Sequence, residues 1–291
     1  MAWIDECLRS VIDQSQVIIV DNNSTDTTLT FIKENYPTAV IFENDINLGF
    51  GRANNIGMKY ALEKGADFVF LLNQDAYLQE NSIKELVSVS KKYPEYGILS
   101  PVHLSINKGL DFKFEKYLKV NTNYFEDLNT NKPLQPIYEY NFLNAAAWLI
   151  PKKVLLNVGG FDPIFFHYGE DENYCQRVKY HNLKIGLVPK VSVIHDRTQY
   201  PKKKPAMFSE KYFKNFEKHI KVAYANINNK EEINFMVRFK YKYLKKALKH
   251  FLFINLSYTK GFLRQHSMLK KIYEDILKSK DLNKKIGNHY L

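Results

Sequence analysis

Gly159-Gly-Phe-Asp-Pro-Ile-Phe-Phe-His-Tyr-Gly-Glu-Asp-Glu-Asn-Tyr-Cys-Gln-Arg177 is the stretch around which the chain is organised. A glycine pair and a proline bend the backbone here, and aromatic residues keep water away from it. Three successive acids, Glu170, Asp171 and Glu172, follow where a helix is expected to begin. One interpretation is that they only complement the positive end of the helix dipole, which stabilises by about 0.3–1 kcal/mol each. The other is that one of them is a carboxylate held for chemistry.

The chain before this stretch alternates between helical periodicity and short apolar runs. A residue pattern with period 3.6 predicts a helix, and a run of four to six apolar residues predicts a buried strand. The alternating segments are residues 3–14, 17–20, 39–42, 47–65, 67–72, 81–93 and 97–102. This alternation predicts an α/β fold with a mixed, mostly parallel sheet flanked by helices.

Two acids follow predicted strands directly, Asp21 after residues 17–20 and Asp75 after residues 67–72. Ligands of such sheets bind beyond the carboxyl ends of the strands, so both acids are expected to face one crevice. A turn residue or a helix cap is the alternative for each acid.

The middle of the chain carries weaker patterns. Residues 110–140 are polar, aromatic and poorly periodic, which predicts loops or a hairpin across the mouth of the crevice. Small residues at 144–150 would let a ligand approach the backbone, and tight core packing explains them equally well. Two short strands are expected at 183–188 and 191–194, the second ending at His195.

Length and composition describe an ordinary globular protein. The 291 residues are 45% hydrophobic and 25% charged. Two cysteines, Cys7 and Cys175, are too few for a disulfide framework or a zinc site, so both are expected to be buried thiols in a reducing cytosol. Residues 1–14 do not resemble a signal peptide, and no run approaches the roughly 18 apolar residues that cross a bilayer. We therefore expect a cytoplasmic protein that is neither secreted nor transmembrane.

The net charge of +11 is unevenly distributed. Residues 201–291 hold 22 Lys and Arg against 7 Asp and Glu, or +15, which leaves 20 against 24, or −4, for residues 1–200. Two domains are expected, a catalytic domain at 1–200 and a basic helical tail at 201–291. Lysines alternate with aromatic and aliphatic residues at 236–254, a pattern that suits amphipathic helices on an anionic membrane surface.

The alternative for the tail is that its helices pack on the catalytic domain or on a second subunit of a homo-oligomer. Binding of nucleic acid by the same charge is disfavoured, because no motif that reads a groove accompanies it.

Five segments of the chain resemble, in the same order, the inverting family-two glycosyltransferases with the GT-A fold, especially their rhamnosyltransferase-like branch. The resemblance covers about residues 1–197. The segments are Val20-Asp-Asn-Asn-Ser-Thr-Asp26, Asn47-Leu-Gly-Phe-Gly-Arg-Ala-Asn-Asn-Ile-Gly57, Leu71-Leu-Asn-Gln-Asp75, Gly159-Gly-Phe-Asp162 and Tyr168-Gly-Glu-Asp171.

The resemblance implies a role for each matching residue. By it, Asp21 contacts the nucleotide base, Asp75 is the last member of a metal-binding acidic motif, and Asp171 is the catalytic base. Glu170 orients that base or binds acceptor hydroxyls. For Glu172, the interpretation that it complements the helix dipole is kept. The residues implied for the nucleotide-sugar site are Asp21, Asn23, Asn47, Gly49, Arg52, Asn54 and Asn73.

The reaction requires such a set. An acceptor hydroxyl that attacks an anomeric carbon must lose its proton, and a carboxylate within hydrogen-bond reach takes it. The nucleoside diphosphate leaves with charge on oxygen, which Mg²⁺ or Mn²⁺ stabilises as a Lewis acid. Asp75 is expected as one ligand of that cation. His195 is the second candidate, with a diphosphate contact, a cap or a core histidine as alternatives.

Two features depart from the family. The family's chain begins with a strand carrying a Thr-Tyr-Asn-like segment, whereas this chain opens at the following helix, so the first strand is expected to be missing. Asn73-Gln-Asp75 also holds one aspartate where the family has two, so the cation is expected to depend on the diphosphate.

The expected function is transfer of a sugar from a nucleotide diphosphate donor to a hydroxyl of a polysaccharide or lipid-linked glycan. The alternative is a non-catalytic scaffold that binds sugar nucleotides or glycans. The sequence identifies neither the donor sugar nor the acceptor.

Overall fold

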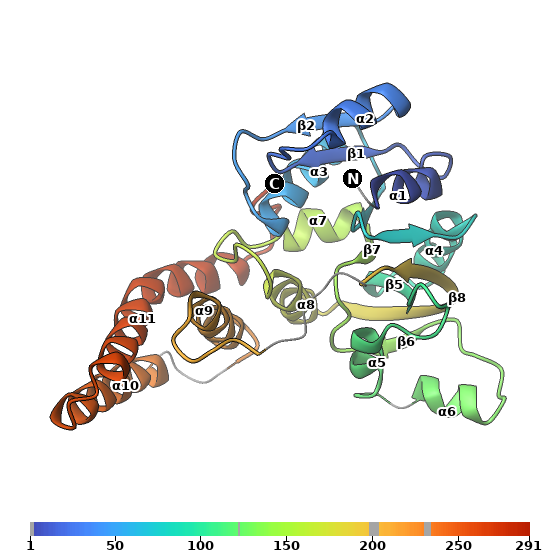
Figure 1. Cartoon of the computed structure of the whole chain (residues 1–291). Coiled ribbons are helices and arrows are strands. Elements are labelled where there is room, and N and C mark those ends of the chain that lie inside the picture. Colours follow the sequence, from blue (N-terminus) through green and yellow to red (C-terminus); the bar gives the residue numbers. More distant parts are fainter. Residues whose placement is uncertain (1–2, 122, 198–203, 230–233) are drawn as a thin grey trace.

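The computed structural model describes residues 3–121, 123–197, 204–229 and 234–291. It shows an α/β body, from which a pair of long C-terminal helices projects to one side (Figure 1). The expected α/β class, with a mixed sheet flanked by helices, is confirmed.

The first part of the body is a small parallel sheet covered by helices. β1 (Ile18–Asp21) pairs with β2 (Val40–Glu43), with Ile18 opposite Val40. α1 (Ile4–Val11) buries Ile4, Leu8 and Val11, the face that its helical periodicity predicts. α2 (Thr28–Asn35) and α3 (Phe50–Glu63) complete this part.

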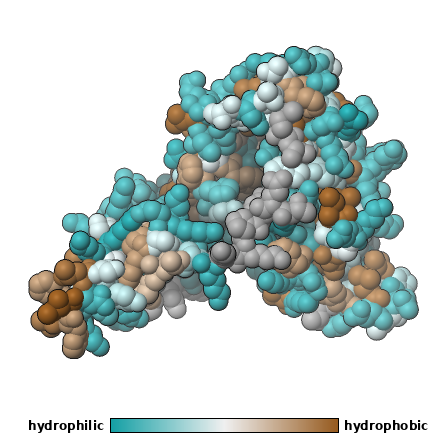
Figure 2. Space-filling model, in the orientation of Figure 1, coloured by the Kyte–Doolittle hydropathy of each residue, from teal (hydrophilic) through white to brown (hydrophobic). Residues whose placement is uncertain are grey.

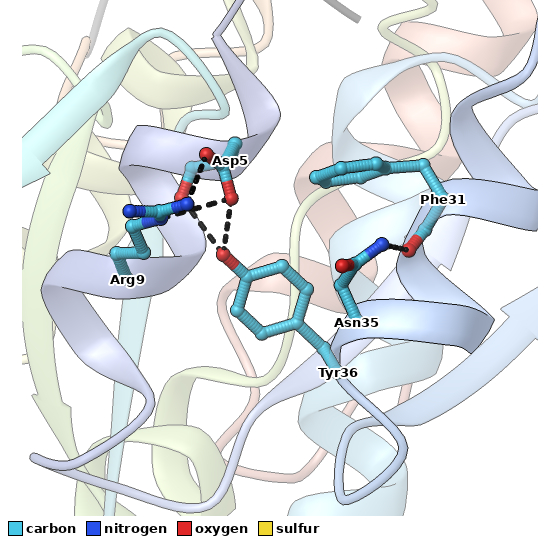
Figure 3. A network of polar contacts seen from close by, with 5 residues as sticks. All are labelled: Asp5, Arg9, Phe31, Asn35 and Tyr36. Atoms are coloured by element: carbon cyan, nitrogen blue, oxygen red, sulfur yellow. Dashed lines mark hydrogen bonds and ion pairs between the residues drawn. The ribbon is translucent and has the colours of Figure 1, made fainter.

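A polar network joins α1 to the end of α2. The Tyr36 hydroxyl donates to Asp5 Oδ1 at 2.6 Å, and Arg9 binds the same carboxylate one helical turn away (Figure 3). Asn35, beside Tyr36, donates instead to the carbonyl of Phe31, within its own helix. The shared carboxylate fixes the position of the first helix against the second.

The larger sheet has six strands in the order β3-β7-β5-β8-β4, with β6 also paired to β8. The prediction of a mostly parallel arrangement is wrong, because β5 and β8 are the only parallel pair of neighbours among the described strands of this sheet. The regular alternation of helix and strand stops after β5, and β7 returns between β3 and β5 in the opposite direction. The bounds are β3 (Phe68–Leu72), β4 (Ala76–Leu78), α4 (Ser82–Lys92), β5 (Tyr96–Leu104), β6 (Tyr138–Tyr140), β7 (Ala147–Pro151) and β8 (Lys184–His195).

β8 is a single long strand where two short ones were expected. Its register against β5 shifts between Val188 and Ser192, which lie opposite the consecutive residues Pro101 and Val102. The extra residues form a bulge, and Pro189 within it has no N–H to donate to a ladder. Proline therefore marks an irregularity within one strand and does not end it.

Residues 110–140 hold two helices and a strand, so the prediction of loops or a hairpin is wrong. α5 (Phe112–Leu118) begins at Asp111, whose carboxylate accepts from the backbone N–H of Phe114 at 2.8 Å. Phe114 and Leu118, four residues apart, are fully buried in the main core. α6 (Asn123–Asn129) follows and leads to β6. The helices form because this short apolar face is capped and packed.

The main core lies between the six-stranded sheet, α7 (Lys152–Val158) and α8 (Glu170–Tyr180). Trp148, Phe161 and Tyr174 are fully buried at its centre. Cys7 and Cys175 are free and buried, as expected.

The C-terminal residues form α9 (Glu210–Tyr224), α10 (Asn234–Leu252) and α11 (Leu256–Asn283). The chain then returns to the body, where the carbonyl of His289 accepts from Gly160 N–H at 2.8 Å (Figure 1). The expected domain boundary at residues 200 and 201 lies outside the described residues. No helix in the ranges that the structure describes is long and apolar enough to span a bilayer.

Candidate active site

The turn after β1 holds the loop that follows β2. Asp21 is buried and accepts from the backbone N–H of Ser24 at 2.8 Å. Asn23 is exposed, with a left-handed φ of 66° that asparagine tolerates. Asn22, which the sequence analysis did not single out, accepts from Leu48 N–H at 3.2 Å and donates to the carbonyl of Gly49. This side chain joins the two halves of the expected nucleotide site.

The loop and helix at residues 47–57 lie against the organising stretch. Asn47 accepts from the N–H of Gly49 at 2.8 Å. Gly49 has a φ of 82°, and a Cβ there would lie 2.0 Å from the carbonyl oxygen of Phe166. Arg52 is exposed and donates to the carbonyl of Pro163 at 3.2 Å. Asn54 donates to Phe50, one turn back in its own helix.

Buried contacts fix this arrangement. The side chain of Asn55 donates to the carbonyl of Phe161 at 2.8 Å and accepts from its N–H at 2.7 Å. A Cβ on Gly51 would lie 2.9 Å from Phe161 Cβ and 3.7 Å from Glu170 Cβ. The beginning of α3 therefore packs directly against the beginning of α8, and the expected donor and acceptor segments meet.

The three acids at the start of α8 have different environments. Glu170 is buried, and its Oε2 has no hydrogen-bond partner in the described part of the chain. Burial, together with the charge of Asp171, raises the pKa of Glu170 to about 7. Asp171 is half-buried and accepts from Glu172 N–H at 2.9 Å. Removal from water raises the pKa of Asp171 to about 6, although backbone N–H groups act in the opposite direction. Glu172 is exposed.

Asp75 and His195 come together through strand pairing. β4 pairs antiparallel with β8 and places Ala76 opposite His195. Asp75 Oδ1 lies 3.4 Å from His195 Nε2, and both side chains are buried. Asn73 is half-buried, and its backbone N–H donates to Ala146 at 2.9 Å. The two expected metal ligands are thus neighbours in space, although 120 residues separate them in sequence.

Two protein ligands suit a cation that also binds a diphosphate. Within residues 3–121, 123–197, 204–229 and 234–291, no three His, Cys, Asp or Glu side chains are grouped to hold a metal. Mg²⁺ and Mn²⁺ are often held by one or two carboxylates and completed by phosphate oxygens and waters. His195 Nδ1 is buried and has no hydrogen-bond partner among the described residues, so the acceptor that commonly orients a metal-bound histidine is not found there. Asp75 and His195 thus place one carboxylate and one imidazole side by side, two donor types that Mg²⁺ or Mn²⁺ accepts, and a cation there would need further ligands from substrate and water.

Further residues surround this pair. His103 of β5 is fully buried, stacks on Phe114 with ring centroids 4.0 Å apart, and meets the His195 ring edge to face at 5.7 Å. Arg197 Nε lies 3.0 Å from Asp111 Oδ2 in a largely buried ion pair. None of these four residues was predicted from the sequence. The capping position of Asp111, three residues before Phe114, was the available signal.

α5 connects the two groups of candidate residues. Burial raises the pKa of Tyr117, the charge of Asp171 raises it further, and Arg197 lowers it. Lys113, one turn earlier, lies within reach of the charges of Arg197, Asp111 and Asp75. One turn of α5 is thus near the charge of Asp75 and the next turn is near the charge of Asp171.

Comparison with known proteins gives one family. The sequence profile of Glycosyl transferase family 2 matches residues 2–147, half of the chain. The low-salt glycan biosynthesis hexosyltransferase Agl10 of Haloferax volcanii is 24% identical over 189 residues, 63% of this chain and 59% of that protein. The dTDP-rhamnosyl transferase RfbF of Shigella flexneri is 23% identical over 183 residues, 63% of this chain and 60% of that protein. The chain therefore spans about three fifths of the length of these relatives.

Solved structures share the fold. The crystal structure of GalNAc-T7 with UDP, GalNAc and Mn²⁺ superposes with a TM-score of 0.56 at 14% identity, over 95% of this chain and 55% of that one. The family expected from the five sequence segments is confirmed. The chain belongs to glycosyl transferase family 2.

Proposed function

We propose that this protein is an inverting, metal-assisted glycosyltransferase of the GT-A type, which uses a nucleotide diphosphate sugar. The observation that carries the proposal is the contact between the loop at 47–57 and the start of α8. There the Gly51 backbone lies beside Glu170, the residue next to Asp171. A donor bound along the loop would thereby place its anomeric carbon near a carboxylate.

Asp171 is the proposed general base. A carboxylate whose pKa is about 6 is largely ionised at neutral pH and still accepts a proton more readily than an ordinary aspartate. As the acceptor hydroxyl attacks the anomeric carbon, its proton passes to Asp171 and the nucleoside diphosphate leaves from the opposite face. Glu170, buried beside it, is proposed to bind acceptor hydroxyls or to orient the base.

Donor recognition is assigned to the side chains around the loop. Asp21 would accept a hydrogen bond from the nucleotide base, and the exposed guanidinium of Arg52 carries the charge that a diphosphate requires. The remaining residues proposed for the nucleotide-sugar site are Asn23, Asn47, Gly49, Asn54 and Asn73.

Asp75 and His195 would hold Mg²⁺ or Mn²⁺. When bound, such a cation stabilises the charge that develops on the leaving diphosphate. His103, which stacks on Phe114, packs against His195 and restricts where its ring can point. The GalNAc-T7 structure, which contains UDP and Mn²⁺, supports this assignment through a shared fold.

The acceptor is proposed to be a hydroxyl of a cell-envelope polysaccharide or a lipid-linked glycan, and glycan biosynthesis in the name of Agl10 supports it. We place the reaction in the cytoplasm at the inner face of the cell membrane. The proposed units are a catalytic domain at 1–200 and a basic helical tail at 201–291.

A donor panel tests the proposal. The full chain is incubated with dTDP, UDP and GDP sugars, membrane extract as acceptor source, and Mn²⁺ or Mg²⁺, and nucleoside diphosphate release is measured. Release with one donor, lost when the cation is chelated, is the expected result. If calorimetry finds no donor binding at millimolar concentration with metal present, the protein is a scaffold and the proposal fails.

A further inference from the structure

The turn between α10 and α11 presents apolar side chains to water. Leu252, Phe253 and Ile254 are 79%, 73% and 83% exposed, and Phe251 and Leu256 on either side are exposed as well. The turn lies at the far end of the hairpin, where Figure 2 shows hydrophobic surface at the greatest distance from the body. A contiguous apolar surface of this kind marks a binding site for a protein or a membrane.

The backbone of the turn is unfavourable for its sequence. Ile254 has a φ of 58°, the left-handed region that β-branched residues rarely adopt. Glycine or asparagine would fit this position without strain and would expose less apolar area. Ile254 therefore combines backbone strain with an exposed apolar side chain. Burial of that side chain by a partner would explain why isoleucine stands at this position.

Positive charge flanks the turn on both helices. Residues 238–264 hold eight Lys and Arg and no acid. An open hollow of about 780 Å³ runs along α10 and is lined almost entirely by cations, namely Arg238, Lys242, Lys245, Lys246 and Lys249, with Tyr241. Lys249 precedes Leu252 by three residues and Lys260 follows Leu256 by four, so a basic level lies about one helical turn behind the apolar end.

An apolar turn with cations one helical turn behind it fits an anionic lipid surface better than a protein copy or a nucleic acid. Apolar side chains enter the boundary between head groups and acyl chains to a depth of about 5–10 Å, which brings cations one turn behind them level with the phosphates. A second copy of the hairpin would bring eight positive charges against another eight. A nucleic acid would leave the apolar turn in water.

We propose that the hairpin end, defined as Phe251–Leu256, inserts into an anionic membrane while the cationic face of α10 binds lipid phosphates. This rests on the proposed location at the membrane and identifies the surface that makes the contact. α9 and the C-terminal part of α11 remain on the body, so the hairpin holds the catalytic domain at a fixed distance from the bilayer.

Vesicle sedimentation of the full chain tests the proposal without any sugar transfer. Wild-type protein should pellet with vesicles of equal parts phosphatidylglycerol and phosphatidylcholine, and stay in solution with phosphatidylcholine alone. The triple variant Leu252→Ser, Phe253→Ser, Ile254→Ser should bind at least about tenfold more weakly. Lys242→Gln, Lys245→Gln, Lys249→Gln should weaken binding about a hundredfold and reduce its salt dependence, since each cation near an anionic surface strengthens binding about fivefold.

Two further measurements separate the alternatives. Val120→Ser removes an equally exposed apolar side chain from the turn after α5 and should leave binding unchanged. Phe253→Trp adds a tryptophan whose emission should shift to the blue only with anionic vesicles. Equal binding of the triple serine variant and the wild type would overturn the proposal. So would a wild-type dimer that those serines convert to a monomer without any vesicle binding.

Discussion

The start of α8 and the outer end of the hairpin differ in how far their charged groups are exposed to water. At α8, carboxylates are withdrawn from water, and the buried Glu170 has an oxygen without a described partner. At the hairpin end, lysines lie in water with no acid between residues 238 and 264. The first region is arranged to change the protonation of a group, and the second to attract an opposite charge. Removing a charge at α8 is therefore expected to change protonation and catalysis, whereas removing one at the hairpin is expected to change binding to an anionic surface.

α11 connects the two regions. Its outer end, at Leu256, is exposed, whereas its inner end is locked to the organising stretch by Asp162. Asp162 Oδ2 accepts from Ser279 Oγ at 2.5 Å and from Asn283 Nδ2 at 2.7 Å, and all three residues are buried. One helix thus fixes the position of the hairpin relative to the candidate base, which follows Asp162 by nine residues.

The largest expected effect comes from Asp171. Asp171→Asn should lower the kcat/KM of transfer about 10³-fold, because the amide cannot take the hydroxyl proton. Donor affinity measured by calorimetry should change little. The matched control is Glu172→Gln, an exposed acid on the same turn, which should retain transfer within about threefold. Full turnover in Asp171→Asn would remove the base assignment.

The next effect concerns the attachment of α11. Asp162→Ala should lower the free energy of unfolding by about 3 kcal/mol, because Ser279 and Asn283 would lose a buried acceptor. The control is Glu210→Ala, which breaks an exposed ion pair between α9 and Arg264 of α11. Its unfolding transition should coincide with that of the wild type in urea. Equal destabilisation by both substitutions would show that burial of Asp162 is not what matters.

The sequence predicted the elements near the candidate site well. The apolar run at 67–72 ends where β3 ends, and the acids at 170–172 begin α8 as expected. These features depend on local chemistry: a short apolar run, a turn, and acids at a helix start. The loop at 47–57 and the stretch at 159–177, which the resemblance assigns to one site, are in contact in the structure, and their shared role stays a prediction.

The features that the sequence did not predict depend on pairing over long distances. The direction of β7 cannot be read from residues 147–151, because the same apolar run suits a parallel or an antiparallel neighbour. The closeness of Asp75 and His195 requires the β4–β8 pairing, and β4 is only three residues long. The basic tail was predicted as amphipathic helices on a membrane, with packing on the catalytic domain as the alternative. In the structure the inner end of α11 packs on the body and its outer end is exposed, a division that depends on tertiary contacts.

The transfer reaction should also depend on pH through Asp171. Its pKa of about 6 lies above the ordinary value of 3.8, and only the ionised form takes a proton. Below about pH 6, kcat/KM should therefore fall about tenfold per pH unit, and it should level off above that value. Initial rates at saturating cation across this range provide the measurement. A profile that stays flat down to the ordinary range of aspartate would indicate a base with an unshifted pKa.

The smallest expected effect is a pH dependence of stability that arises from Glu170. Its folded pKa of about 7 exceeds the ordinary 4.5, so between these values the folded state binds more protons than the unfolded state. The stabilisation is complete below about pH 4.5 and is lost as the pH rises through 7. Glutamine cannot ionise, so Glu170→Gln does not suffer this loss. The free energy of unfolding of the variant, minus that of the wild type, should therefore rise by on the order of 2 kcal/mol from pH 4.5 to pH 7.

Urea unfolding at both ends of this range measures that difference. The same comparison with Glu172→Gln should give a smaller change. That side chain is exposed, and although partial burial also raises its pKa, the charge of Lys218 opposes the shift. The contrast between these two acids of one helical turn isolates the degree of burial as the cause, since both share the dipole of the same helix. If neither variant gains stability over the wild type as the pH rises, burial does not raise the pKa of the acids at the start of α8, and Asp171 loses the physical basis for its role as a base.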